Sequence, residues 1–166
     1  MEDSGRSEPP APVNETLGRS YLQKAHLRLA ALEFYHERRG YSDVVREAQE
    51  CVELALKGLL RHIGVEPPKQ HDVGALVVGS RALLHPATHA SLDRVAAISK
   101  RLRKEREFAF YGDDDFVPTE EYSAEDARRA IEDATFVVAT ADAALSSVPA
   151  DTRPASEQDA AADPKG

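Results

Sequence analysis

The chain is 166 residues long, with a formal net charge of -8 at pH 7 and a sequence pI of about 5.3. This balance argues against unassisted, sequence-independent binding to nucleic acid, which normally needs a dominant positive surface, but it leaves room for a local basic groove. The single cysteine excludes an intrachain disulfide, and no apolar run approaches the roughly 18 residues of a membrane helix. We therefore expect a one-domain cytoplasmic protein that makes no membrane contact.

The two ends of the chain have the composition of disordered segments. Residues 1–13 contain three prolines and two glutamates with almost nothing apolar, and residues 147–166 are of the same kind. We expect a disordered leader over 1–13, a single helical domain over 14–146 and a disordered tail over 147–166.

Two long helices are predicted at the start of the domain. The first runs from Asn14, which can cap it, to Arg39, with Gly40 as its stop. The second begins at Ser42, a good cap, and ends at Gly64 ahead of a Pro-Pro pair. Apolar residues of the first helix recur at three- and four-residue spacing, at Leu22, Ala25, Leu29 and Leu32.

A short helix and a third long one follow. The short helix is predicted over residues 72–84 and is closed by Pro86. The next long helix begins at Thr88 or His89 and extends to Tyr111, where a polar loop begins.

The last helix has the clearest start signal. Ser123 and Asp126 form a capping-box arrangement, with Asp standing where Glu is usual. Its apolar stripe keeps a strict helical rhythm through Ala127, Ile131, Ala134, Val138, Ala141 and Leu145. Nothing in the chain alternates with period two over the length of a strand. We therefore predict an all-α fold, an up-and-down four-helix bundle with one short additional helix.

The second helix carries a polar spine along about a third of its circumference. The spine consists of Arg46, Gln49, Glu50, Glu53, Lys57 and Arg61. Arg46–Glu50 and Glu53–Lys57 have the i,i+4 spacing of attractive pairs, so an ordinary solvent-exposed face explains the pattern. The alternative is that the spine faces a groove or a second subunit, where Arg46, Gln49, Glu53 and Lys57 would bind a ligand.

The end of the fourth predicted helix, KRLRKEREFAFYGDDD, is the most distinctive segment of the chain. Basic residues near a helix C-terminus complement the helix dipole, and Gly112 can supply a left-handed cap, which is a structural explanation. The functional alternative is an arginine-lined surface beside aromatic rings, with Arg103 and Arg106 able to hold a phosphate and Tyr111 able to stack on a base.

No metal or cofactor site is predicted. The triple aspartate 113–115 fits no calcium loop and is better explained as a solvated turn, while His85 and His89 flank Pro86 rather than share a helix face. Cys51 lies among apolar helix neighbours, so we expect it in the core rather than as a nucleophile.

The order of these features resembles the HEPN domain family. The second helix and its continuation match a family segment through Gln49, Glu53, Lys57, Leu59, Leu60, Gly64, Pro67 and His71. The later segments KEREFAFYGD and YSAEDARRAIEDA are similar to the closing pair of helices of the family, and the resemblance covers about residues 17–145.

This resemblance implies a helical bundle that homodimerises, with a functional cleft at the dimer interface. Many members are metal-independent ribonucleases, often toxins paired with a minimal nucleotidyltransferase antitoxin. Their active site is an Arg followed, after four to six residues, by a His on the equivalent of the fourth helix. The His would transfer a proton of the ribose hydroxyl, and the Arg would stabilise phosphate charge.

The chain departs from the family pattern at this active site. Arg106 matches the arginine, but Tyr111 stands where the His is expected, and no histidine occurs after His89. A phenol with a pKa of about 10 is a poor base at neutral pH. We therefore predict a non-catalytic HEPN-like homodimer that binds nucleotide, RNA or a partner nucleotidyltransferase. The alternatives are a ribonuclease toxin of a toxin–antitoxin pair, using Arg106 with Tyr111 or with the ligand-binding candidate His71, and a purely structural helical adaptor.

Overall fold

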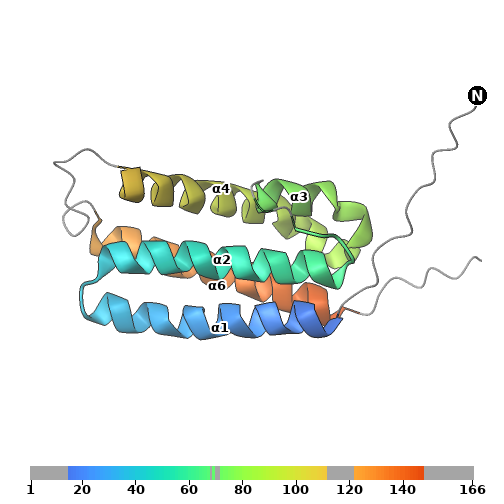
Figure 1. The fold of residues 1–166 in the computed structure, drawn as a ribbon, viewed down its shortest axis with the longest axis horizontal. Helices are drawn as coiled ribbons and strands as arrows, with labels where there is room; N and C mark the ends of the chain where they lie inside the picture. The colour runs from blue at the N-terminus through green and yellow to red at the C-terminus, as the bar shows by residue number, and fades with distance from the viewer. Residues whose placement is uncertain (1–14, 68, 70–71, 112–121, 148–166) are drawn as a thin grey trace, which may run out of the picture.

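The protein folds into an antiparallel bundle of four long helices (Figure 1). The computed structural model describes residues 15–67, 69, 72–111 and 122–147, and for 107–111 the backbone alone. The described elements are α1 (Glu15–Glu37), α2 (Tyr41–His62), the short α3 (Val73–Gly79), two single-turn 3₁₀ helices (Arg81–Leu83 and Pro86–Thr88), α4 (His89–Tyr111) and α6 (Ala124–Ser146). The predicted all-α class is confirmed. The predicted leader and tail lie outside the described residues, apart from Ser147.

Helix α2 occupies the centre of the bundle. It lies between α1 and α4 and also packs on α6, which crosses behind it in Figure 1. The four long helices alternate in direction along the chain, and α3 lies beside the first half of α4. The polar spine of α2 is only partly exposed: Arg46 is exposed, Gln49 is buried, and the other members are intermediate, namely Glu50, Glu53, Lys57 and Arg61.

The core is built mainly from Ala, Leu and Val, with α2 as its largest contributor. Helix α2 buries nine apolar side chains at 2% exposure or less, namely Val44, Val45, Ala48, Cys51, Val52, Ala55, Leu56, Leu59 and Leu60. Burial confirms Cys51 as a core residue, and its thiol donates to the backbone carbonyl of Ala25 at 3.2 Å. Burial is also the main reason that the pKa of Cys51 is raised to about 12.

The turn between α1 and α2 differs from the predicted one. Arg39, with φ 61°, takes the left-handed position that was predicted for Gly40. The amide of Gly40 bonds the Tyr35 carbonyl at 2.9 Å and that of Arg39 bonds the His36 carbonyl at 3.0 Å, which is the Schellman pattern. Gly40 then precedes α2 as its N-cap, so the prediction of Ser42 as cap was wrong. No side chain caps this end, because the helix follows the turn directly.

Of the other predicted helix boundaries, two agree with the structure and two do not. Gly64, with φ 77°, ends α2 in the same hydrogen-bond pattern. The capping box of Ser123 and Asp126 is present, and hydrogen bonds from Ser123 are the main reason that the pKa of Asp126 lies below its usual range. The short helix was predicted too long, since α3 ends at Gly79. Pro86 opens a 3₁₀ turn rather than closing α3.

Helices α1 and α2 approach each other most closely where two glycines meet. A Cβ built on Gly58 would lie 2.9 Å from the Gly18 carbonyl oxygen, and one built on Gly18 would lie 2.9 Å from that of Gly58. Only glycine allows the backbones this near, so the pair sets the crossing of the two helices. No helix in the described part of the chain combines the length and apolarity needed to cross a bilayer.

Candidate functional site

The predicted ligand-binding residues of α2 form a continuous polar chain with Arg106 of α4. The side chain of Gln49 is almost fully buried, at 6% exposure. Its amide nitrogen donates to Glu53 Oε2 at 2.9 Å, and its amide oxygen accepts from Arg106 Nη1 at 2.7 Å. Both ends of the amide are satisfied in only one orientation, so Gln49 acts as a fixed link between Glu53 and Arg106.

Arg106 is held by a carboxylate as well as by this amide. The same Nη1 lies 2.5 Å from Glu50 Oε1, and the two side chains are 35% and 30% exposed. Helical geometry explains the contact, since Gln49 and Glu50 are on the side of α2 nearest the C-terminal half of α4. The arginine is thus oriented by two residues of α2 and still reaches the surface.

Lys57 completes the chain at the far side of Glu53. Its ammonium lies 2.6 Å from Glu53 Oε1, which realises the predicted i,i+4 pair. Burial raises the pKa of Glu53, but hydrogen bonds from Lys57 and Gln49, together with the charges of Lys57 and Arg106, outweigh it, and the net pKa lies below its usual value. Glu53 is therefore ionised at neutral pH.

Arg46 is placed differently from the prediction. Its expected partner one turn along, Glu50, is bound to Arg106 instead. The guanidinium of Arg46 lies 3.5 Å from Asp43 Oδ1, and both of these side chains are about half exposed. Arg46 is therefore near the polar chain but is not joined to it.

The remaining predicted site residues are only partly described. Arg103 is exposed on α4, one turn before Arg106, on the side of the helix that packs against α3. Tyr111 ends α4, but its side chain lies outside the described residues, and so do His71, Gly112 and the aspartates 113–115. The pairing of Arg106 with Tyr111 or His71 therefore stays a prediction.

Sequence reasoning missed the central part that Glu50 plays. It assigned this carboxylate to Arg46 by helical spacing, because a partner from α4 is not visible in a local pattern. It also missed the ion pairs Arg28–Glu47, at 2.6 Å, and Arg61–Glu66, at 2.8 Å, which flank the polar chain.

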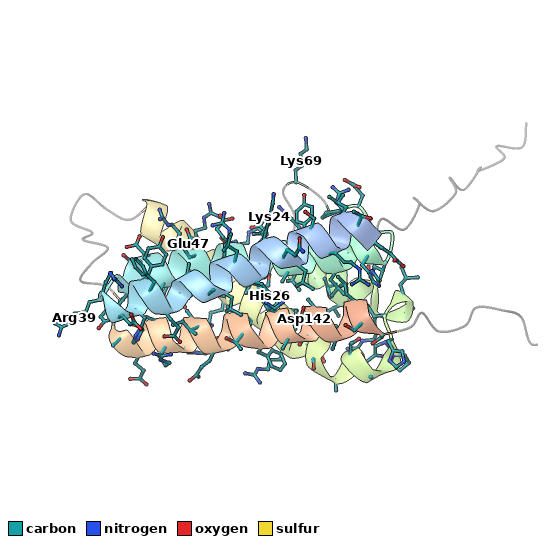
Figure 2. The ribbon with its side chains drawn as sticks, turned by 90° about the horizontal axis from the view of Figure 1, so that it is seen from below. Lys24, His26, Arg39, Glu47, Lys69 and Asp142 are labelled. Atoms are coloured by element: carbon teal, nitrogen blue, oxygen red, sulfur yellow. The ribbon has the colours of Figure 1, made fainter. Side chains whose placement is uncertain are left out.

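These residues make one surface, which we name the α2 outer face. Seven basic side chains face five acidic ones there, so its described part is positive although the whole chain carries -8. Figure 2 shows Lys24 on the same side of α1 as Glu47, whose ion pair among the described residues is with Arg28. The members of the face are Lys24, Arg28, Asp43, Arg46, Glu47, Glu50, Glu53, Lys57, Arg61, Glu66, Arg103 and Arg106.

Polar contacts elsewhere join helices without forming a comparable surface. Asp133 of α6, 13% exposed, accepts a short hydrogen bond from Arg101 of α4, while Arg94 and Arg129 lie 4.0 Å away. His26 and Asp142 meet at 2.9 Å between α1 and α6, away from Lys24 (Figure 2). Across the described residues, no group of three His, Cys, Asp or Glu side chains could hold a metal ion.

The described residues thus form an all-α bundle with a polar face built on its central helix. A family model described as HEPN domain matches residues 19–143, and the chain belongs to this family. No curated protein and no solved structure matches the chain significantly. The HEPN resemblance seen in the sequence is thereby confirmed. HEPN domains are commonly associated with nucleotides or RNA.

Proposed function

We propose that the protein is a non-catalytic HEPN module that binds a phosphate-bearing ligand, a nucleotide or RNA, on the α2 outer face, and that it does so as a homodimer. The observation that carries the proposal is the double anchoring of Arg106 by Gln49 and Glu50. An arginine whose fork is already oriented loses little side-chain entropy when a phosphate binds.

The charge of the face supports binding of an anion. Basic residues exceed acidic ones among its described side chains, and two of the cations, Lys24 and Arg46, are not held in short ion pairs within the described residues. A local excess of this kind attracts phosphate even on an acidic chain, and it predicts binding that weakens as salt is raised.

The chemistry of the face supports binding rather than cleavage. Ribonuclease action needs a group that exchanges a proton near neutral pH. Position 111 is a tyrosine, and no histidine follows His89 in the sequence. Glu53, the half-buried carboxylate of the polar chain, has a lowered pKa and is a weak base. Arg106 thus retains the phosphate-binding half of the family site without its proton-transfer partner.

The test is cleavage and binding measured on the same preparations. A labelled total-RNA pool is incubated in EDTA with wild-type protein and with Arg106→Ala, and fluorescence anisotropy follows a fluorescein-labelled oligoribonucleotide of mixed sequence. We expect intact RNA in both samples and weaker anisotropy binding by the variant. Cleavage that disappears in Arg106→Ala would instead establish the ribonuclease alternative.

The same experiment distinguishes a purely structural adaptor from a module that binds a ligand. An adaptor predicts neither an anisotropy change nor a nucleotide-dependent rise in melting temperature, whereas a ligand that binds only the folded state raises it. The homodimer is tested by light scattering during size-exclusion chromatography. If RNA and nucleotides both fail to bind a dimeric preparation, a nucleotidyltransferase partner becomes the occupant to test on this face.

A further inference from the structure

Glu50 occupies the position at Arg106 that a ligand phosphate would take. Its Oε1 lies 2.5 Å from Arg106 Nη1, closer than the Gln49 oxygen at 2.7 Å on the same nitrogen. Glu50 is thus an anionic group of the same chain that already contacts Arg106, and a phosphate that binds this guanidinium has to compete with it. Gln49, being buried and neutral, can stay bound while Glu50 leaves, so the arginine keeps its orientation.

Glu50 also has a second cation within reach. Arg46 is one helical turn earlier, at the i,i+4 spacing that brings two side chains of a helix together. It is about half exposed and contacts Asp43 only at 3.5 Å, beyond ordinary hydrogen-bond length. The Arg-before-Glu order is the weaker orientation of such a pair, which explains why Glu50 contacts Arg106 rather than Arg46 in the structure.

We infer that Glu50 exchanges between two arginines: it holds Arg106, as in this structure, and moves to Arg46 when a ligand phosphate binds Arg106. Glu50 therefore sets the affinity of the site and discriminates against weak anions, because a ligand displaces it only if its phosphate gains more from Arg106 and the neighbouring cations of the face than the carboxylate does. Arg46 acts as a positioning residue that accepts the displaced carboxylate and does not touch the ligand. This inference rests on the proposed function.

The first test compares two variants that remove the same charge from the same helix. Glu50→Gln deletes the competing carboxylate, while Glu47→Gln deletes one that pairs with Arg28 and lies away from Arg106. Both raise the net charge of the chain by one, so general electrostatic attraction changes equally. We expect Glu50→Gln to bind the labelled oligoribonucleotide on the order of threefold to tenfold more tightly than Glu47→Gln does.

The second test is a double-mutant cycle between Glu50 and Arg46. In the wild-type background, Arg46→Ala removes the alternative partner of Glu50 and should weaken binding by roughly threefold. In the Glu50→Gln background there is no carboxylate to receive, so Arg46→Ala should change binding very little. An effect of Arg46→Ala that is equal in both backgrounds would show that Arg46 contacts the ligand directly, and it would overturn the exchange.

The outcomes separate this inference from the function on which it rests. Binding that needs Arg106 but is equal in Glu50→Gln and Glu47→Gln overturns the exchange and leaves the proposed function standing. Absence of binding by wild type and by Glu50→Gln at low salt overturns both. Circular dichroism of each variant shows that it is folded, and Glu50→Ala provides a second removal of the carboxylate with a different side-chain volume.

Discussion

The contact between Gly18 and Gly58 allows a sharp prediction about stability. Gly58→Ala would place a methyl group 2.9 Å from the Gly18 carbonyl oxygen, 3.1 Å from Tyr21 Cβ and 3.4 Å from the Leu22 amide nitrogen. Two of these atoms belong to the backbone of α1 and cannot rotate away. The helices must therefore separate at their crossing, and the side chains around it lose contact.

The expected magnitude follows from two opposing effects. Alanine is favoured over glycine inside a helix by about 0.8–1.0 kcal/mol, whereas overpacking of a well-filled contact costs about 1–3 kcal/mol. Because backbone atoms set the clash, we expect the upper part of the second range. The free energy of unfolding of Gly58→Ala should be lower than that of wild type by about 1–2 kcal/mol.

Urea unfolding followed by far-UV circular dichroism measures this difference. The matched control is Gly79→Ala at the end of α3, where a Cβ would meet nothing within 4 Å and φ is not left-handed. That variant should be unchanged or more stable by up to about 1 kcal/mol, because alanine restricts the unfolded chain. If Gly58→Ala proved as stable as wild type, the close crossing would not be a constraint on the fold, and the argument would fail.

Three further properties of the protein can be tested, each by its own measurement. Arg39→Gly should stabilise the protein by about 0.5–1 kcal/mol, since glycine takes a left-handed backbone without strain, and an unchanged urea midpoint would contradict the turn geometry. Burial, opposed by Glu15 and assisted by Arg19, lowers the pKa of His62 below 6.5, so the unfolded state binds the proton more tightly. The free energy of unfolding should thus fall as pH drops below that value, and His62→Gln should lose this slope; an identical slope in the variant would refute the assignment. The thiol of Cys51, with its pKa raised to about 12, should react with Ellman's reagent only as fast as the protein opens, and rapid labelling under native conditions would disprove its burial.

The sequence was a good guide wherever the signals were local. The start of α6 was predicted because Ser123 and Asp126 satisfy each other within one turn, and its stripe was predicted because the apolar rhythm is unbroken. The turn after α1 was mispredicted, although its signal is also local. Glycine is the usual left-handed residue, but here Arg39 takes that conformation, and Gly40 begins the next helix. Only the hydrogen bonds back to Tyr35 and His36 reveal the shift by one residue.

The candidate site was predicted only in part, because its key contact crosses between helices. Four of the proposed ligand-binding residues, Gln49, Glu53, Lys57 and Arg106, do lie in one chain of contacts. Helical spacing alone paired Glu50 with Arg46, which is the best partner within α2. The stronger partner, Arg106, is far away in sequence. Whether Glu50 on α2 and Arg106 on α4 lie at the same level along the bundle axis depends on the packing of the whole bundle. Whether these residues bind a ligand stays a prediction.

The way α4 is held makes its C-terminal half the natural place for a response to a ligand. The buried apolar side chains that the structure describes on α4, Leu92, Val95, Ile98 and Leu102, all precede the turn that carries Arg106. From Arg101 onward, the described contacts of α4 include several polar ones: Arg101 with Asp133 and Glu105, the Tyr122 hydroxyl with the Glu105 carbonyl, and Arg106 with Gln49 and Glu50. Exchange of one carboxylate for a phosphate at Arg106 therefore changes a contact that positions this half of the helix without opening the apolar core. A ligand bound there would act on the α4 end first, and amide hydrogen exchange in residues 103–111 should slow on RNA binding while exchange in the core of α2 stays constant.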